Sequence, residues 1–186
     1  MDAKSVTACV ALALVTGGAA SAQVVDQSQP LENHFIFFAR PDLAQSFMQA
    51  ADNIVGAEIK LWAAQGSGPG DVTIELWDRL PPQGGRMLAT GTERGVQPGA
   101  WATVWWPVVS VVPETTYYLV FHTTNTSFGI SIHDGNPYSR GMVFAMPGFQ
   151  PYPQFDYTFQ TYAVPEPAGL SVLALLVTVF ARRRSR

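Results

Sequence analysis

Two short segments of the sequence carry the side chains whose types and spacing could do chemistry. Residues 56–62 (GAEIKLW) and residues 71–78 (DVTIELWD) each hold a glutamate and a tryptophan on alternating positions. Outward tryptophans offer flat apolar faces that suit the C–H faces of sugar rings, and exposed apolar patches often mark binding sites. The sequence therefore singles out Trp62 and Trp77 as candidate carbohydrate-binding residues.

The glutamates of the same segments, Glu58 and Glu75, are the candidates for catalysis. A glycosidase needs two carboxyl groups about 5 to 10 Å apart, on either side of the bond it cleaves. On a flat sheet face these two side chains would lack an enclosing pocket, so the sequence favours a protein without catalytic residues. Hydrolysis of a polysaccharide by surface carboxylates stays open as the alternative function.

The alternation of side chains predicts how the two segments are positioned. Opposite charges stabilise a cross-strand pair, so a hairpin between the segments is expected to place Lys60 opposite Glu75. Both tryptophans would then point outward on one face. The alternative is that another strand, residues 23–41 or a long loop covers them. The residues predicted to face the core are Ala57, Ile59 and Leu61 in the first segment and Val72, Ile74 and Leu76 in the second.

Other chemistry would need motifs that this sequence lacks. His34, His122 and His133 form neither an H-x-H nor an H-E-x-x-H pattern, and the sequence contains no G-x-S-x-G. We expect no metal site and no cofactor, with a structural Ca²⁺ held by carboxylates and carbonyls as the alternative. Its carboxylates would come from strand ends and turns, where the sequence has Asp71, Asp78, Asp134 and Asp156. Asp is also an ordinary turn residue, so no ligand set is chosen.

Short alternating runs divided by Gly and Pro make up most of residues 23–163, and helical periodicity is nearly absent. Many short strands with regular turns predict an all-β fold, a single antiparallel β-sandwich or a barrel. Trp105 and Trp106 are adjacent and must point to opposite faces, so one of them is expected in the core. The predicted strands are residues 56–62, 71–78, 100–106, 116–123, 128–133, 141–145 and 156–162, with residues 45–48 and 87–92 as weaker candidates.

The charge balance of this region excludes one class of partner. Residues 23–163 contain six Lys and Arg side chains and twelve Asp and Glu side chains, a formal charge of −6. Nucleic acids select basic surfaces, so nucleic acid is not an expected partner. Cys9 is the only cysteine, and a chain that has lost residues 1–22 must hold its fold together by core burial alone.

The first 22 residues predict export. They contain one early cation, an apolar run of about ten residues and the small-residue site Ala20-Ser21-Ala22 before Gln23, which is the layout of a secretory signal peptide. Such a run is too short to cross a bilayer of about 30 Å as a helix. We expect passage through the secretion translocon and cleavage after Ala22. The alternative is a buried N-terminal helix.

The last residues predict a contact with a membrane. Residues 168–181 are a 14-residue apolar stretch, and arginines follow it. As a helix the stretch would be about 21 Å long, which is short for a stable transmembrane span. The arginines would stay in the cytoplasm and hold the rest of the chain outside. We expect a transient association of this hydrophobic helix with the inner membrane, with a plain C-terminal anchor as the alternative.

The same end of the sequence resembles a known sorting signal. Val164, Pro165, Glu166 and Pro167, then the apolar helix, then Arg182, Arg183 and Arg184 follow one another within the last 23 residues. This order resembles the PEP-CTERM signal of Gram-negative bacteria. The resemblance implies that an exosortase in the inner membrane processes residues 164–186. Proteins with this signal tend to occur in bacteria that make exopolysaccharide and biofilm.

A second resemblance covers most of the remaining chain. The motifs IKLW, DVTIELWD, W-x-T-V-W-W-P, P-E-T-T-Y-Y-L-V-F, N-P-Y-x-x-G and DYTFQTY follow one another between Ala44 and Tyr162. In this order they resemble a jelly-roll-like β-sandwich that occurs in many exported bacterial proteins with varied C-terminal anchors. The resemblance implies one such domain over residues 44–163. Residues 23–43 are poorly patterned and are expected to form a partly ordered lead-in.

These observations predict an exported protein of the cell surface or extracellular matrix of a Gram-negative bacterium. We expect a non-enzymatic β-sandwich with a structural or adhesive role. Weak binding of a carbohydrate such as exopolysaccharide is the expected use of Trp62 and Trp77. The fold alone does not establish this use, because one fold carries many functions.

Overall fold

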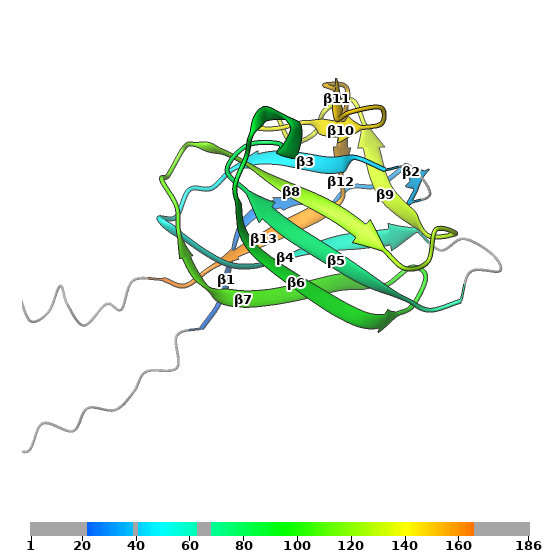
Figure 1. Cartoon of the computed structure of the whole chain (residues 1–186), viewed down its shortest axis with the longest axis horizontal. Helices are drawn as coiled ribbons and strands as arrows, with labels where there is room; N and C mark the ends of the chain where they lie inside the picture. Colours follow the sequence, from blue (N-terminus) through cyan, green and yellow to red (C-terminus); the bar gives the residue numbers. More distant parts are fainter. Residues whose placement is uncertain (1–21, 39–40, 63–67, 166–186) are drawn as a thin grey trace, which may run out of the picture. The chain divides into compact units, whose positions relative to one another are not determined.

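The computed structural model describes residues 22–38, 41–62 and 68–165. These residues form two antiparallel β-sheets that make a β-sandwich (Figure 1). The first sheet contains β1 (Val24–Gln29), β2 (His34–Phe37), β4 (Asn53–Trp62), β7 (Trp101–Ser110), β9 (Gly129–Asp134), β12 (Phe155–Tyr157) and β13 (Phe159–Ala163). The second contains β3 (Leu43–Met48), β5 (Gly70–Trp77), β6 (Met87–Val96), β8 (Thr116–Thr123), β10 (Val143–Ala145) and β11 (Gln150–Tyr152). A short 3₁₀ helix, η1 (Pro81–Gln83), lies between β5 and β6.

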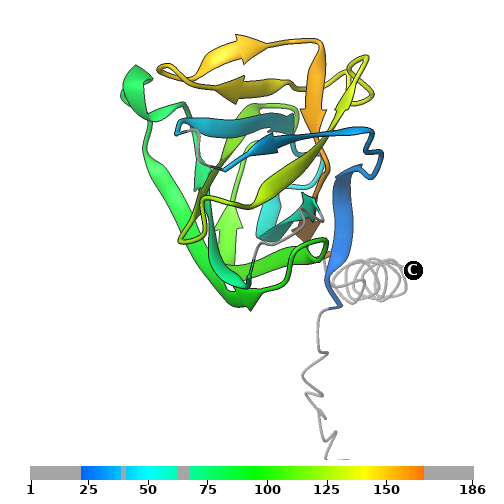
Figure 2. The same ribbon diagram turned by 90° about the vertical axis from the view of Figure 1, so that its right-hand side faces the viewer.

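Many neighbouring strands come from distant parts of the chain. The first sheet has the order β1–β13–β4–β9–β12, with β7 paired to β4 and β2 paired to β9. The second has the order β11–β10–β3–β8–β5–β6. In Figure 1 the strands β8, β5 and β6 lie side by side and cross over β4 and β13, and Figure 2 shows the same layers turned by 90°. The all-β prediction with two antiparallel sheets is confirmed.

The core lies between the two sheets, and alternate residues of β4 and β5 point into it, as the sequence predicts. Burying one aliphatic side chain stabilises a fold by about 1.5–3 kcal/mol, so the apolar residues of each strand determine which of its faces turns inward. Trp106 is also in the core at 7% exposed, and its neighbour Trp105 points the other way, as expected. The residues predicted to face the core are all fully buried: Ala57, Ile59 and Leu61 from β4, and Val72, Ile74 and Leu76 from β5.

The predicted hairpin between residues 56–62 and 71–78 is wrong, because β4 and β5 belong to different sheets. In the first sheet, β13 and β7 pair with the same stretch of β4 from opposite edges, and β9 pairs with its last two residues. In the second sheet, β5 lies between β8 and β6. Both edges of each strand are therefore occupied. Lys60 consequently pairs with Trp101 instead of Glu75.

The segment expected to be a lead-in, residues 23–43, belongs to the sandwich. It carries β1 and β2 and ends on the first residue of β3. Gln27 and Gln29 of β1 are buried, and the Gln27 side-chain oxygen accepts a 2.8 Å hydrogen bond from the Tyr138 hydroxyl. Because the inward positions of β1 carry amide side chains, the segment does not show alternating apolar residues. This explains why residues 23–43 were predicted to be a lead-in.

A buried carboxyl group lies in the same polar part of the core. Asp156 is fully buried and accepts hydrogen bonds from the Gln45 side chain at 3.0 Å and from the Tyr138 backbone N–H at 2.9 Å. Burial raises the pKa of Asp156, and these two hydrogen bonds act in the opposite direction. Asp156 and Gln45 thus join β12 to β3 across the sandwich.

Several sequence predictions fall outside the described residues. They are the signal helix, the C-terminal hydrophobic helix and the site residues Ala20, Glu166, Pro167, Arg182, Arg183 and Arg184. Ala22 and Gln23 are described and lie exposed before β1. In the described part of the chain, no helix is long and apolar enough to cross a membrane.

Candidate functional site

The two tryptophans singled out by the sequence lie on different sheets. Trp62 is the last residue of β4 in the first sheet, and its ring stacks on Phe35 with centroids 5.5 Å apart. Trp77 ends β5 in the second sheet, where it packs on a small cluster that includes Leu80, and its indole N–H donates to Glu75 at 2.8 Å. They do not form one platform. Each is partly covered, as the alternative prediction from the sequence had it. Phe35, within residues 23–41, covers Trp62, and the loop that contains Leu80 covers Trp77.

The outer face of the first sheet gathers more aromatic rings than the sequence analysis proposed. Paired residues on neighbouring strands point to the same face of a sheet, so the register of β4 fixes which side chains join Lys60 and Trp62 outside. Trp101 pairs with Lys60, and Trp105 and Tyr162 both pair with Gly56. Phe37 of β2 pairs with Gly129, as does Trp62. We call the following set the aromatic strip: Phe35, Phe37, Trp62, Trp101, Trp105 and Tyr162.

One end of the aromatic strip is a pair of rings beside Gly56. The ring centroids of Trp105 and Tyr162 are 4.8 Å apart, with 47° between their planes. A Cβ at Gly56 would lie 2.5 Å from Cε3 of Trp105, so the six-membered ring of this tryptophan occupies the space that a side chain would fill. Trp105 nevertheless stays 48% exposed. Glycine at this position of β4 therefore lets a large ring approach the sheet while leaving much of its surface open to solvent.

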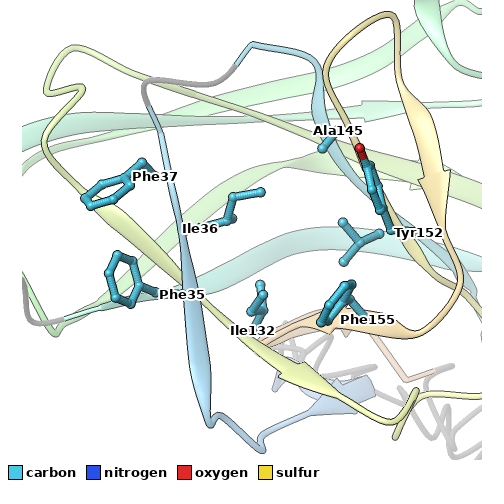
Figure 3. A pocket seen from close by; sticks show the side chains of 8 residues that line it. Phe35, Ile36, Phe37, Ile132, Ala145, Tyr152 and Phe155 are labelled. Carbon is cyan, nitrogen blue, oxygen red and sulfur yellow. The ribbon is translucent and has the colours of Figure 1, made fainter.

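The other end repeats this arrangement beside Gly129. A Cβ there would lie 2.9 Å from Cδ2 of Phe35 and 3.0 Å from Cβ of Trp62. Phe35 also meets Phe37 edge to face, with centroids 5.0 Å apart. Figure 3 shows Phe35 and Phe37 on one side of β2 and Ile36 on the other. Phe35 and Phe37 remain 39% and 49% exposed, so this end also presents apolar ring surface to solvent.

Polar groups lie between the two aromatic ends. The Lys60 ammonium is 5.8 Å from the ring centroid of Trp101, a cation–π distance. Lys60 also lines a shallow hollow of about 250 Å³ with Trp62 and Glu32. Glu58, only 9% exposed, accepts a 2.8 Å hydrogen bond from the Thr103 hydroxyl. The strip therefore alternates ring faces with charged and hydroxyl groups.

The electrostatics of the strip keep its phenol protonated. Burial raises the pKa of the Tyr162 hydroxyl, and a hydrogen bond with the Glu58 carboxylate and the charge of that carboxylate raise the pKa further. The hydroxyl also approaches the side-chain oxygen of Gln160 at 3.5 Å. Tyr162 thus remains an uncharged donor over the whole neutral and mildly alkaline range.

The two glutamates considered for catalysis do not come together. Glu58 lies on the outer face of the first sheet and Glu75 lies on the second, so the core separates them. Glu75 is occupied by the Trp77 indole and lies 3.4 Å from the His122 ring nitrogen. These two carboxylates therefore cannot act on one glycosidic bond.

The aspartates considered for calcium are also dispersed. Among the described residues, no three His, Cys, Asp or Glu side chains gather as a metal site. Each aspartate instead accepts a hydrogen bond from the protein. The donors are the Gly95 N–H for Asp71, the Arg86 N–H for Asp78, the Asn33 amide for Asp134, and Gln45 with Tyr138 for Asp156.

An apolar cavity of about 380 Å³ opens near β2, β9 and β10–β12, and Phe35 and Phe37 of the aromatic strip are part of its lining (Figure 3). Ile36, Ile132 and Phe155 point into it from different strands. Tyr152 is the one polar side chain in its lining, and the Tyr152 hydroxyl approaches the Met146 carbonyl at 3.5 Å. The cavity offers apolar volume without a group that would orient a ligand.

Of the rings in the aromatic strip, only Trp62 was a candidate from the sequence. The other five, Phe35, Phe37, Trp101, Trp105 and Tyr162, were not assigned to a site. The sequence alone could have grouped Trp101 with Trp105, because residues four apart in a strand point to the same face. The fold and this face define an antiparallel β-sandwich with a partly exposed aromatic strip. No protein-family model matches the sequence, and a search of curated proteins finds no match.

Proposed function

We propose that this chain is an exported, non-enzymatic β-sandwich protein of the cell surface or extracellular matrix that binds carbohydrate through the aromatic strip. The observation that carries the proposal is the pair of exposed aromatic ends on one sheet face, at Trp105 with Tyr162 and at Phe35 with Trp62. Exposed rings rimmed by polar groups are a feature of binding sites. A sugar ring can place its C–H face on such a ring and its hydroxyls on the neighbouring polar groups.

We propose a jelly-roll-like sandwich between a signal helix and a C-terminal hydrophobic helix, with residues 164–186 processed by an exosortase after transient contact with the inner membrane. One contact supports this boundary. The Val164 N–H donates to the Asn53 side chain at 2.8 Å and the Val164 carbonyl accepts from it at 2.9 Å, while Pro165 is exposed. The strands thus end just before Val164 and Pro165, the first two residues of the proposed sorting motif.

Carbohydrate binding is tested by titrating the purified full-length chain with a soluble neutral β-glucan and with alginate. We expect Trp105→Ala to weaken the binding by about tenfold, which corresponds to about 1.4 kcal/mol. Trp77→Ala is the matched control, because it also removes a tryptophan but from the second sheet. Unfolding curves of both variants show whether each remains folded. Equal affinity of the wild type and the folded Trp105→Ala variant would refute a role for the strip.

Sorting is tested by the intact mass of the protein recovered from outside the cells. A mass that begins at Gln23 and ends between Val164 and Pro167 is expected if both terminal signals are removed. A recovered mass that still contains Arg182–Arg186 would mean that the tail is an ordinary anchor, and the assignment to the matrix would then lose its main support.

A further inference from the structure

We propose that an internal stretch of one linear, uncharged polysaccharide occupies both ends of the aromatic strip at once, lying along β4. This inference rests on the carbohydrate binding proposed above and specifies the kind of chain that is bound. It follows from the spacing of the two aromatic ends, from the polar groups between them and from the charge of the domain.

The spacing comes from β4 itself. Gly56 underlies Trp105 at one end of the strip, and Trp62 forms part of the other end six residues later in the same strand. A strand rises about 3.3 Å per residue, so the two ends are roughly 20 Å apart. This is too far for one sugar ring to touch both, and it suits a short run of linked sugars. Trp101 pairs with Lys60 between the two ends, so the path has an aromatic ring near its middle.

The open arrangement of the strip favours an internal stretch of polysaccharide over a chain end. The end at Trp105 and the end at Phe35 and Phe37 both lie on an outer sheet face and are between 39% and 49% exposed. The hollow beside Lys60 is shallow and holds about 250 Å³. Recognition of a chain end needs a closed pocket that stops the chain, whereas an open face lets the chain continue past both ends of the strip.

Charge argues for an uncharged polysaccharide. Among the described residues, one cation, Lys60, lies between the ends of the strip, with the Glu58 carboxylate on the same face and the Glu32 carboxylate in the hollow. The surrounding domain has six cationic and twelve acidic side chains. A polysaccharide with a carboxylate on each sugar would meet net repulsion. Sugar hydroxyls, by contrast, can donate to the exposed Glu32 carboxylate and to the Tyr162 oxygen, and can accept from the Lys60 ammonium.

The same polar groups favour a glycan over a second copy of this protein. In a symmetric contact, the strip of one copy would take Lys60 and Glu32 of both chains out of water. Burying charges is unfavourable unless each finds a partner. A glycan leaves these groups partly hydrated and pairs them with hydroxyls. Dimerisation through the strip is nevertheless a distinct outcome of the experiment below.

The experiment measures affinity against chain length with the full-length protein. β-1,4-linked glucose oligosaccharides are the probes, a disaccharide, a tetrasaccharide and an octasaccharide, each titrated calorimetrically. When two linked sites are occupied together, the second event is intramolecular and affinity rises steeply. We expect the octasaccharide to bind at least about tenfold more tightly than the disaccharide. Mannuronate oligosaccharides of the same lengths should bind more weakly than the neutral series.

Variants at the two ends of the strip test whether each end contributes to the binding of the long oligosaccharide. Trp105→Ala and Trp62→Ala should each abolish the gain from disaccharide to octasaccharide while leaving disaccharide binding at the intact end. Phe37→Ala, at an exposed ring, replaces Trp62→Ala if the latter does not fold, and Trp77→Ala should keep the full gain. Equal affinity for short and long chains, or tighter binding of the mannuronate series, would overturn the inference and leave carbohydrate binding standing. If no sugar binds and Trp105→Ala turns a dimer into a monomer, the proposed function fails as well.

Discussion

Replacing Gly56 with alanine should destabilise the sandwich and displace the ring of Trp105. The added Cβ would lie 2.5 Å from Cε3 of Trp105 and 2.6 Å from the carbonyl oxygen of Val104. The tryptophan side chain is half exposed and can swing outward. The Val104 carbonyl belongs to the backbone of β7, which is paired to β4, so it can retreat only if the two strands separate locally.

The magnitude follows from these two distances. The Val104 carbonyl must move by about 0.4 Å to bring the contact even to 3.0 Å, the limit for real Cβ contacts. Overpacking of this kind costs about 1–3 kcal/mol. Losing a glycine also restricts the unfolded chain, which stabilises the protein by about 0.4–1 kcal/mol when the native conformation is compatible. We therefore expect Gly56→Ala to lower the free energy of unfolding by about 1–2 kcal/mol.

The assay is urea unfolding followed by far-ultraviolet circular dichroism, together with the β-glucan titration. Gly68→Ala is the matched control, because a Cβ there would meet nothing within 4 Å. The control should be neutral or slightly stabilising and should keep its affinity for the glucan. If Gly56→Ala matched Gly68→Ala in both measurements, the account of Gly56 as the residue that seats the Trp105 ring would be wrong.

Further predictions concern the polar part of the core. Burial raises the pKa of Asp156 above its unfolded value of about 3.9, so the stability from this group is fully present below the unfolded pKa and is lost as the pH rises through the folded pKa. The unfolding free energy of the wild type minus that of Asp156→Asn should therefore increase as the pH falls toward about 4; a difference that shrinks in acid would contradict this assignment. Tyr138→Phe removes the 2.8 Å hydrogen bond to Gln27 and should cost about 1–3 kcal/mol in chemical unfolding, since a buried amide loses its partner. Tyr152→Phe, whose hydroxyl makes only a 3.5 Å contact, should be nearly neutral in the same measurement.

Local patterns in the sequence were sufficient to predict the fold class and the inward faces. Alternation in residues 56–62 and 71–78 placed all six core side chains correctly, because a strand fixes which residues share a face. The same rule put Trp105 and Trp106 on opposite faces. These predictions use only neighbours within one strand, for which the period of two is a geometric necessity.

The pairing of strands was beyond the reach of such patterns. β4 finds β13 about a hundred residues later in the chain, and β1 pairs with the same β13 from the other side. Cross-strand charge pairs contribute only about 0.2–1 kcal/mol each, so Lys60 and Glu75 could not decide which strands pair. The site was missed for the same reason, because the aromatic strip collects rings from β2, β4, β7 and β13.

The glycines of the first sheet bear on whether the aromatic strip serves stability alone. A glycine inside a strand costs about 0.5–1 kcal/mol relative to alanine, and a ring from a neighbouring strand can recover some of this by covering the exposed backbone. One ring over each glycine would be enough for that purpose. At Gly129 the Phe35 ring fills this place, and two further rings pack on Phe35 itself, Trp62 by stacking and Phe37 edge to face.

The exposure of these rings also argues against a role in stability alone. Covering a glycine stabilises a strand only through the ring surface that is buried, yet Trp105 and Phe37 leave 48% and 49% of their surfaces in water. That open surface contributes nothing to the sandwich and leaves an apolar face prone to unwanted contacts. A role in stability accounts for the buried half of each ring, and the carbohydrate binding that we propose would account for the half that remains exposed.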